Sequence, residues 1–357
     1  MALYFGLALA FYFTLWKKHK VFFYSFFFLL LFFAVFRDTS VGSDNFIYAK
    51  NYSIVSYNSN TWSAFTEMEP AYCWLMAFCK QSLGMSYVAF MRLNAFVALA
   101  GFFFFIKKSS VNMVISLFFF YMLTYYTASF NIMRQFFALG LYLFFYSNFF
   151  FDNLNDKRKI IIYEIITVLI AFGFQKTLLV LTILPVFNSE IVGNITRSSK
   201  IQIFLWGSFV VGGFSDIMVS NISGLSHILS FLGDRYVGYI TVSANSEKYS
   251  ILSSLMDTTV VSLLCYSIKE KRPAGVSYYA VILGVVVANV FGGMSALFLR
   301  VATNLNIFRI ILFPYAWYNS RNPKFIKVVL VVYASILFFK AIIKNFGIVV
   351  PYTFWGG

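Results

Sequence analysis

The chain has 357 residues, of which 60% are hydrophobic and only 11% are charged, and its mean hydropathy is +0.77. A soluble core could not bury that share of apolar side chains, so the composition predicts a polytopic membrane protein and excludes a water-soluble enzyme. The formal net charge of +15 would suit a nucleic-acid partner, but the basic residues gather mostly in short clusters between apolar segments. That distribution is typical of cytoplasmic loops, so nucleic-acid binding is not expected.

The cysteine and histidine content gives little support to a metal centre or a thiol nucleophile. The chain holds three cysteines, Cys73, Cys79 and Cys265, and two histidines, His19 and His227. Their spacing matches no pattern of metal ligands, and small residues packed in or near helices account for the cysteines. We therefore expect neither a metal nor a cofactor.

Many separate apolar segments of helix length predict an all-α fold. Inside a bilayer every backbone polar group must be satisfied internally, which only helices and closed barrels achieve. Barrel strands alternate apolar and polar residues, whereas the segment FYSFFFLLLFFAVF at 23–36 shows no alternation. We expect a polytopic helical membrane protein with about twelve transmembrane helices and one re-entrant half-helix. It would form a single integral membrane domain over residues 1–357.

The first two apolar segments place a long polar stretch on the outer face. Residues 2–16 are apolar with no basic residue before them, and KKHK follows at 17–20, which predicts a retained span with its N-terminus outside. Residues 21–36 return the chain to the outer face, so the stretch at 37–69 is an outer loop. It holds four of the thirteen carboxylates, Asp38, Asp44, Glu67 and Glu69.

Residues 70–83 and 87–106 allow two topologies. The first segment is apolar but short and is broken by a Lys-Gln pair, and the second ends in two lysines at 107–108. If both were full spans, these lysines and the basic cluster at 156–159 would lie on the outer face. A re-entrant or interfacial half-helix at 70–83 restores the expected distribution of positive charge for the rest of the chain, and we favour it.

The remaining apolar segments alternate with polar turns along the chain. Basic clusters mark inner loops at 152–159, 269–272 and 319–324. Outer turns are expected at 129–135, 174–177 and 294–303, with a second long outer loop at 220–252.

Five cations stand alone at the outer ends of predicted helices, where the insertion rule disfavours them. They are Arg37, Arg134, Lys176, Arg235 and Arg300. Cations kept on that face suit an anion, and Arg binds phosphate through two parallel charge-assisted hydrogen bonds, each worth roughly 1.5–3 kcal/mol. The alternative for each cation is pairing with a carboxylate such as Asp38, Asp234 or Glu69.

Four short motifs occur in an order typical of a known family. They are Arg37 with Val41-Gly42-x-Asp44 and Tyr48, then Glu69-Pro70-x-Tyr72, Arg134-Gln135 at a helix start, and Arg300 ahead of a late span. In these motifs and in hydropathy the chain resembles the Wzy-type O-antigen and capsular polysaccharide polymerases, in the branch that includes EpsG. It departs from the family at Gln175-Lys176-Thr177, where the family often has a His. Lys176 would supply only charge there.

The resemblance implies a fold similar to lipid-dependent glycosyltransferases of the GT-C type, and an activity at the outer face of the bacterial inner membrane. Such polymerases move a growing glycan from undecaprenyl pyrophosphate to the non-reducing end of a lipid-linked oligosaccharide repeat unit. The substrate would be an undecaprenyl-pyrophosphate-linked oligosaccharide, as in O-antigen and other lipopolysaccharide or polysaccharide biosynthesis. The expected partners are membrane lipid and a chain-length regulator protein.

The leaving pyrophosphate gains negative charge, which preorganised arginines stabilise without an obligatory metal. We expect Arg134 and Arg300 at the pyrophosphate and Arg37 near the acceptor. A sugar hydroxyl needs a base, and Asp44 or Glu69 could serve if its surroundings raise its pKa. The candidate substrate-binding residues, including two tyrosines that could stack on sugars, are Arg134, Gln135, Lys176, Arg235, Arg300, Tyr48 and Tyr236.

Two other classes remain open. An O-antigen ligase or another membrane transferase would share the pyrophosphate leaving group and differ in its acceptor. A transporter or flippase for polysaccharide or lipid would place polar residues near the membrane midplane and in broken helices, whereas the lone cations here lie at one predicted depth.

Overall fold

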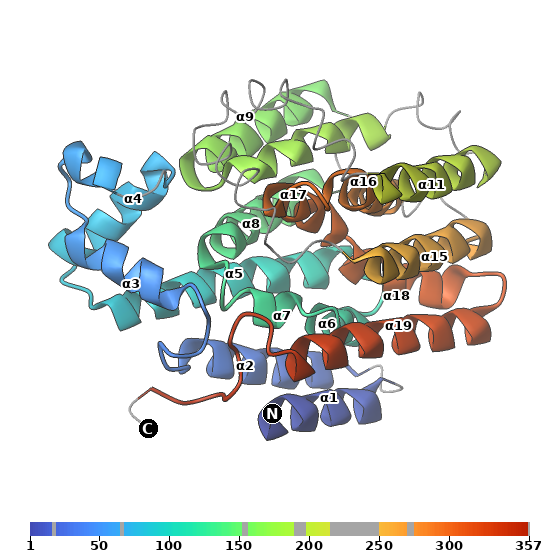
Figure 1. Ribbon diagram of the computed structural model, residues 1–357, viewed down its shortest axis with the longest axis horizontal. Coiled ribbons are helices and arrows are strands. Elements are labelled where there is room, and N and C mark those ends of the chain that lie inside the picture. Colours follow the sequence, from blue (N-terminus) through green and yellow to red (C-terminus); the bar gives the residue numbers. More distant parts are fainter. Residues whose placement is uncertain are drawn as a thin grey trace. The chain divides into compact units, whose positions relative to one another are not determined.

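The computed structural model describes residues 1–15, 19–64, 68–151, 156–188, 198–214, 250–269 and 275–355, and these residues are almost entirely helical (Figure 1). The first half contains α1 (Ala2–Thr14), α2 (Lys20–Val35), α3 (Asn45–Ile54), η1 (Ser59–Ala64), α4 (Pro70–Ala77), η2 (Phe78–Ser82), α5 (Tyr87–Ser109), α6 (Met113–Met122), α7 (Tyr125–Ala128), α8 (Met133–Phe145) and η3 (Tyr146–Phe150). The second half contains α9 (Lys157–Phe174), η4 (Lys176–Asn188), α11 (Ser198–Gly213), α15 (Ile251–Ser267), α16 (Gly275–Phe291), α17 (Ala296–Asn306), α18 (Arg309–Asn319) and α19 (Pro323–Ile343). The all-α prediction is confirmed for this part of the chain, where β pairing is limited to isolated bridges.

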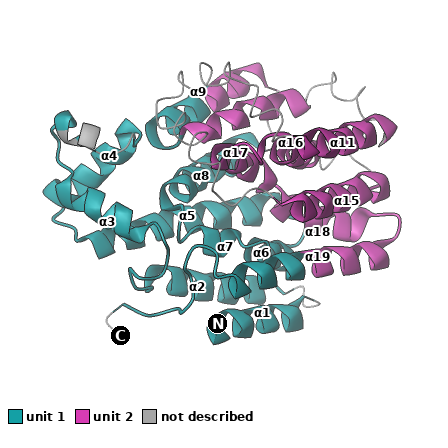
Figure 2. Ribbon diagram, viewed as in Figure 1, with its two compact units in different colours: residues 1–153, 165–175, 334–357 teal, residues 154–164, 176–333 magenta. Residues whose placement is uncertain are grey.

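The chain divides into two compact units, which Figure 2 distinguishes by colour. Unit 1 comprises residues 1–153, 165–175 and 334–357, and unit 2 comprises residues 154–164 and 176–333. Each unit is described by itself below. The single integral membrane domain expected from the sequence stays a prediction.

The helices are apolar, as expected for a helical membrane protein. By length and composition, α5 and α19 could each cross a membrane, and α17 with α18 could form a third span that bends by 45° at its break. Six further apolar helices of 10–17 residues occur among the described residues. Some apolar stretches are divided by a change of helix type, as where α8 continues into the π-helical η3. The count of about twelve spans stays a prediction.

In unit 1, α5 and α8 pack closely because glycines face each other. A Cβ on Gly101 would lie 2.0 Å from the carbonyl oxygen of Gly140, and a Cβ on Gly140 would lie 2.6 Å from the Cα of Ala98. Small residues let two apolar helices approach to backbone contact, which replaces the hydrophobic drive that lipid cannot supply. This contact fixes α8, whose second residue is Arg134.

The polar stretch at 37–69 has more structure than the outer loop expected from the sequence. It contains α3 and the 3₁₀ segment η1, and it leads to α4. The helix α4 begins at Pro70, whose missing N–H suits the first helical position, and it continues as the π-helical η2 to Ser82. This short combined helix matches the extent of the segment predicted at 70–83, and its re-entrant or interfacial placement stays a prediction.

Backbone N–H groups of residues 42 and 43 join three segments of unit 1. The N–H of Gly42 donates to Ile348 O at 3.0 Å, and the N–H of Ser43 donates to Gly347 O at 2.8 Å. The same Ser43 N–H donates to Asn131 Oδ1 at 2.9 Å. The regions around residues 42, 131 and 348 therefore form one platform at the ends of their helices.

In unit 2, a buried polar network joins three adjacent helices, α11, α15 and α16, which lie side by side in Figure 1. The amide of Asn289 on α16 donates to Ser208 on α11 at 3.1 Å and to Thr258 on α15 at 2.8 Å, and it accepts from Ser254 at 2.6 Å. Every polar group in this cluster gains a partner, so it links the helices without leaving a buried group unsatisfied.

The outer turn expected at 294–303 is mostly helical. Ser295 accepts a hydrogen bond from the N–H of Leu297 and caps α17, and Arg300 lies within that helix. The polar residues in this stretch suggested a turn, but they occupy one face of an amphipathic helix whose other face is buried.

Candidate functional site

The candidate site in unit 1 is built around an ion pair between Arg134 and Glu69. The Nη1 atom of Arg134 lies 2.5 Å from Oε2 of Glu69, and the two side chains are only 5% and 2% exposed. Each residue sits at a helix start: Arg134 is the second residue of α8, and Glu69 immediately precedes α4. The pairing alternative considered from the sequence is therefore realised for Arg134.

Arg37 reaches Met133, the residue before Arg134, and its polar contacts among the described residues are with neutral groups. Its guanidinium donates to the carbonyl of Ala34 at 2.9 Å and to Sδ of Met133 at 3.2 Å, and it stands over the ring of Phe130 at 4.6 Å. Met133 directly precedes Arg134, so Arg37 and the ion pair both contact the first turn of α8. The side chain of Arg37 is 1% exposed, and its Nε has no hydrogen-bond partner among the described residues.

The charge of Arg37 persists at neutral pH despite its burial. Desolvation lowers the pKa of Arg37 to about 10, still well above 7. With Glu69 paired to Arg134, these three side chains carry one surplus positive charge in a largely dehydrated region. A buried cation without a counter-ion costs free energy, and an anion brought to it would recover that cost.

Tyrosines line the same region. The ring of Tyr48 meets that of Tyr72 edge-on at 6.4 Å, and the Tyr72 hydroxyl donates to Asn94 Oδ1 at 2.9 Å. Tyr72 lies within electrostatic range of both Arg134 and Tyr48. Tyr48 is only 8% exposed, so in this structure it is part of an aromatic layer next to the ion pair.

The two candidate bases have different surroundings. Glu69 is buried and paired with Arg134, whereas Asp44 is half-buried and accepts a hydrogen bond from the Ser43 hydroxyl at 3.1 Å. Asp44 precedes α3 without capping it. Gln135, the neighbour of Arg134 on α8, is 2% exposed. The structure thus gathers Arg37, Glu69, Arg134, Gln135 and Tyr48 in one region and leaves the Asp44 carboxylate at its more open edge.

Two further predicted cations lie on neighbouring elements of unit 2. Lys176 opens η4 and Arg300 lies in α17, and these two elements pack against each other. Asn304, one helical turn after Arg300, donates to the hydroxyl of Thr177 at 3.1 Å. The two cations therefore stand on adjoining stretches of the packed elements. Arg235 and Tyr236, and nearly all of the predicted loop at 220–252, lie outside the described residues.

Unit 2 also holds a buried charged cluster that the sequence did not single out. The guanidinium of Arg309, at the start of α18, donates to Oδ2 of Asp257 at 2.8 Å and to the hydroxyl of Tyr333 at 2.6 Å. The Tyr333 hydroxyl donates in turn to Oδ1 of Asp257. Asp257 and Arg309 each lie inside an apolar segment of the sequence, and charged residues in such segments usually pair with one another.

The fold and these sites describe an all-helical, apolar protein with buried cations at helix starts, which is consistent with the class of helical membrane proteins. Comparison with known families is more specific: the sequence profile of the EpsG family matches residues 20–354. The chain therefore belongs to the EpsG family, a family of Wzy-type polymerase-like proteins, and the resemblance drawn from the short motifs is confirmed. No curated protein and no solved structure matches the chain.

Proposed function

We propose that this protein is a polysaccharide polymerase that extends a lipid-linked glycan. The observation that carries the proposal is the surplus positive charge of buried Arg37, which contacts the same first turn of α8 that holds the Arg134–Glu69 pair in unit 1. Membership of a family of polysaccharide-polymerase-like membrane proteins supports this reading. The bond broken in such a transfer leaves a pyrophosphate, whose developing negative charge matches this region.

The reaction would proceed by displacement at the anomeric carbon of the donor sugar. The bond from that carbon to the oxygen of undecaprenyl pyrophosphate breaks, and a bond forms to a hydroxyl at the non-reducing end of a second lipid-linked repeat unit. Arg37 and Arg134 would stabilise the leaving pyrophosphate, with Glu69 acting as a positioning residue for Arg134. Their charge is fixed in place before the reaction and needs no reorganisation during it.

Asp44 is the better candidate for the base. The carboxylate of Glu69 is engaged by Arg134, whereas Asp44 is half-buried and, within the described part of the chain, its carboxylate accepts a hydrogen bond from the Ser43 hydroxyl alone. A base must reach the proton that it accepts, so access favours Asp44. The acceptor proton would pass to Asp44 as the new glycosidic bond forms.

Lys176 and Arg300 would bind a second anionic group. Polymerisation uses two lipid-pyrophosphate substrates, the donor and the acceptor, and unit 2 offers its own pair of cations on η4 and α17. Lys supplies a point charge and Arg a planar fork, and both bind phosphate. The finer features of the proposal are a GT-C-like architecture, a site on the outer face of the bacterial inner membrane, and a chain-length regulator as partner.

The test is polymerisation by purified protein in lipid nanodiscs. The substrate is the lipid-linked repeat unit extracted from a strain that lacks this protein, and the expected products are a ladder of longer lipid-linked glycans and free undecaprenyl pyrophosphate. Transfer of single repeats to a different acceptor would identify a ligase, and movement of the substrate across a vesicle membrane without a new bond would identify a flippase. Either result would overturn the polymerase proposal.

A further inference from the structure

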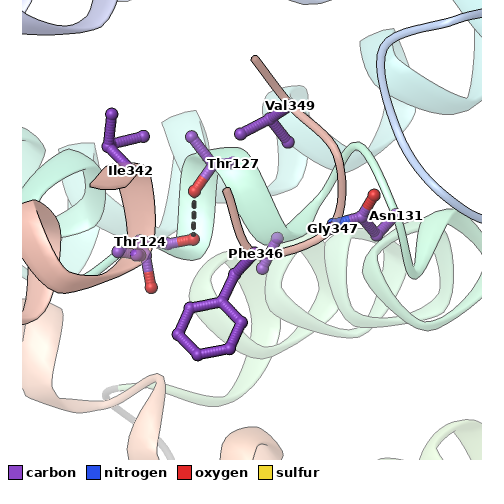
Figure 3. Close-up of a pocket in the computed structure, with 9 residues that line it drawn as sticks. Thr124, Thr127, Asn131, Ile342, Phe346, Gly347 and Val349 are labelled. Carbon is purple, nitrogen blue, oxygen red and sulfur yellow. Dashed lines mark hydrogen bonds between the residues drawn. The ribbon is translucent and has the colours of Figure 1, made fainter. Parts of the chain in front are cut away.

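A half-enclosed cavity of about 220 Å³ lies in unit 1 between α7 with its flanking residues and the last turn of α19 with the segment that follows it (Figure 3). Its lining residues are Thr124, Thr127, Ala128, Asn131, Ala341, Ile342, Phe346, Gly347 and Val349. None of these nine residues is charged. Ligand pockets for drug-sized molecules span about 300–1,000 Å³, so this cavity suits a smaller group.

The cavity wall combines hydroxyl and amide groups with an aromatic ring. Thr124 and Thr127 present hydroxyls, and the Thr127 hydroxyl donates to the carbonyl of Thr124 at 3.1 Å, which leaves its oxygen able to accept (Figure 3). Asn131 contributes a side-chain amide, and Phe346 contributes a partly exposed ring. Neutral hydrogen-bonding groups beside an aromatic face suit a polyol with an apolar face, which is the chemistry of a sugar ring.

Backbone conformations of high energy concentrate at this cavity. Among the described residues, the non-glycine residues with positive φ are Thr124 at 66°, Asn345 at 50° and Ile348 at 52°. Thr124 lines the cavity, and the other two flank lining residues 346 and 347. Thr and Ile are β-branched and disfavour this conformation strongly, so surrounding contacts must hold them there. Strain of this kind gathers at ligand-binding positions more often than elsewhere.

The cavity adjoins the cationic region of unit 1. Asn131 follows Phe130, the residue over whose ring the guanidinium of Arg37 stands. The Oδ1 atom of Asn131 accepts from the Ser43 N–H, and Ser43 precedes Asp44 in the chain. A Cβ at Gly347 would lie 1.4 Å from Nδ2 of Asn131, so only glycine leaves room for this amide. One substrate could therefore place an anion at Arg37 and a neutral ring in the cavity.

We propose that this cavity is a subsite for one sugar ring of the lipid-linked glycan whose pyrophosphate meets Arg37 and Arg134. The inference rests on the proposed function and adds a neutral subsite to its charged one. The nine lining residues carry no charge, so the cavity offers phosphate none of the cations that bind it most strongly. The hydroxyls of Thr124 and Thr127 and the amide of Asn131 would hold the ring, with Phe346 against its apolar face.

Direct occupancy can be tested by thiol labelling of an Ala128→Cys variant. The native cysteines in the described residues, Cys73, Cys79 and Cys265, are all buried, so the new thiol should dominate labelling by a maleimide. The free oligosaccharide released from the lipid-linked repeat by mild acid should slow labelling several-fold, and inorganic pyrophosphate should not. Equal labelling rates with and without the oligosaccharide would overturn the subsite, whether or not the protein polymerises.

Filling the cavity provides a second measurement. Ala341→Leu adds bulk inside it, and Ile343→Phe adds bulk on the same helix end at a residue that is 63% exposed and outside the lining. Ala341→Leu should raise the half-saturating concentration of lipid-linked repeat about tenfold, the equivalent of losing roughly one or two hydrogen bonds. The control should match the wild type. If Ala341→Leu polymerises with wild-type saturation, the subsite is wrong and the polymerase stands; if the wild type makes no polymer, the polymerase proposal fails.

Discussion

Replacing Arg134 alone should lower the free energy of unfolding more than replacing both members of its ion pair. Arg134→Met leaves the carboxylate of Glu69, which is 2% exposed, without its guanidinium partner. Breaking a buried pair in this way costs about 3–5 kcal/mol because an uncompensated charge stays buried. The double variant Arg134→Met with Glu69→Gln removes both charges at similar volume, so we expect it to recover most of that loss and to lie within about 1–2 kcal/mol of the wild type.

Activity should follow a different order from stability. The single and double variants both lack the guanidinium, so neither should extend the lipid-linked repeat, although the double variant is well folded. Stability is measured as the temperature of half-aggregation in detergent, and activity as the product ladder in nanodiscs. Equal stability of the single and double variants would refute the buried pair, and a polymerising double variant would refute the role of Arg134 at the pyrophosphate.

Three further outcomes follow from the structure. Arg37→Met should abolish polymerisation yet leave the half-aggregation temperature unchanged or raised, because it removes a buried charge whose described partners are neutral. A large loss of stability would contradict that account. Asp257→Asn leaves the guanidinium of Arg309 without a carboxylate and should destabilise the protein by about 3–5 kcal/mol, which the same thermal assay would detect. Unchanged stability would show that this pair is not formed. For topology, a membrane-impermeant maleimide applied to whole cells should modify Cys placed at exposed Ser59 and not at exposed Arg158; the reverse pattern would put the unit 1 site on the cytoplasmic side.

The helical class and the family were accessible from the sequence because both depend on local information. The hydrophobic composition indicates a membrane protein, and apolar segments that do not alternate with polar residues indicate helices. The short motifs around Asp44, Glu69 and Arg134 carry the family resemblance, and the matching profile over residues 20–354 confirms it. The presence of a short helix at 70–82 was also accessible, because the short apolar segment there is broken by a Lys-Gln pair; its re-entrant placement, argued from the positions of positive charge, stays a prediction.

The contacts within the sites were not accessible in the same way. Arg134 and Glu69 lie far apart in the sequence, and their pairing depends on how α4 and α8 pack, which no local pattern specifies. The polar residues near Arg300 indicate a turn because one face of an amphipathic helix is polar, and Ser295, which caps the start of α17, lies within the same stretch. The cavity at 124–131 and 341–349 brings together segments separated by about 200 residues in the chain, so only tertiary structure reveals it.

Two buried arginines in this chain differ in whether a carboxylate balances their charge. Arg309 has a carboxylate at 2.8 Å and a tyrosine hydroxyl at 2.6 Å, so its charge is balanced within unit 2. Arg37 is at least as buried, yet its contacts are a carbonyl, a thioether and an aromatic ring.

If stability alone determined position 37, an apolar side chain would avoid the desolvation cost, or a nearby carboxylate would offset it. A balanced pair attracts no further anion, whereas an unbalanced cation gains free energy when one arrives. The same cost that weakens the resting fold at Arg37 would therefore become binding free energy for a pyrophosphate. On this argument Arg309 stabilises the helices of its unit, and Arg37 is the residue whose charge the substrate completes.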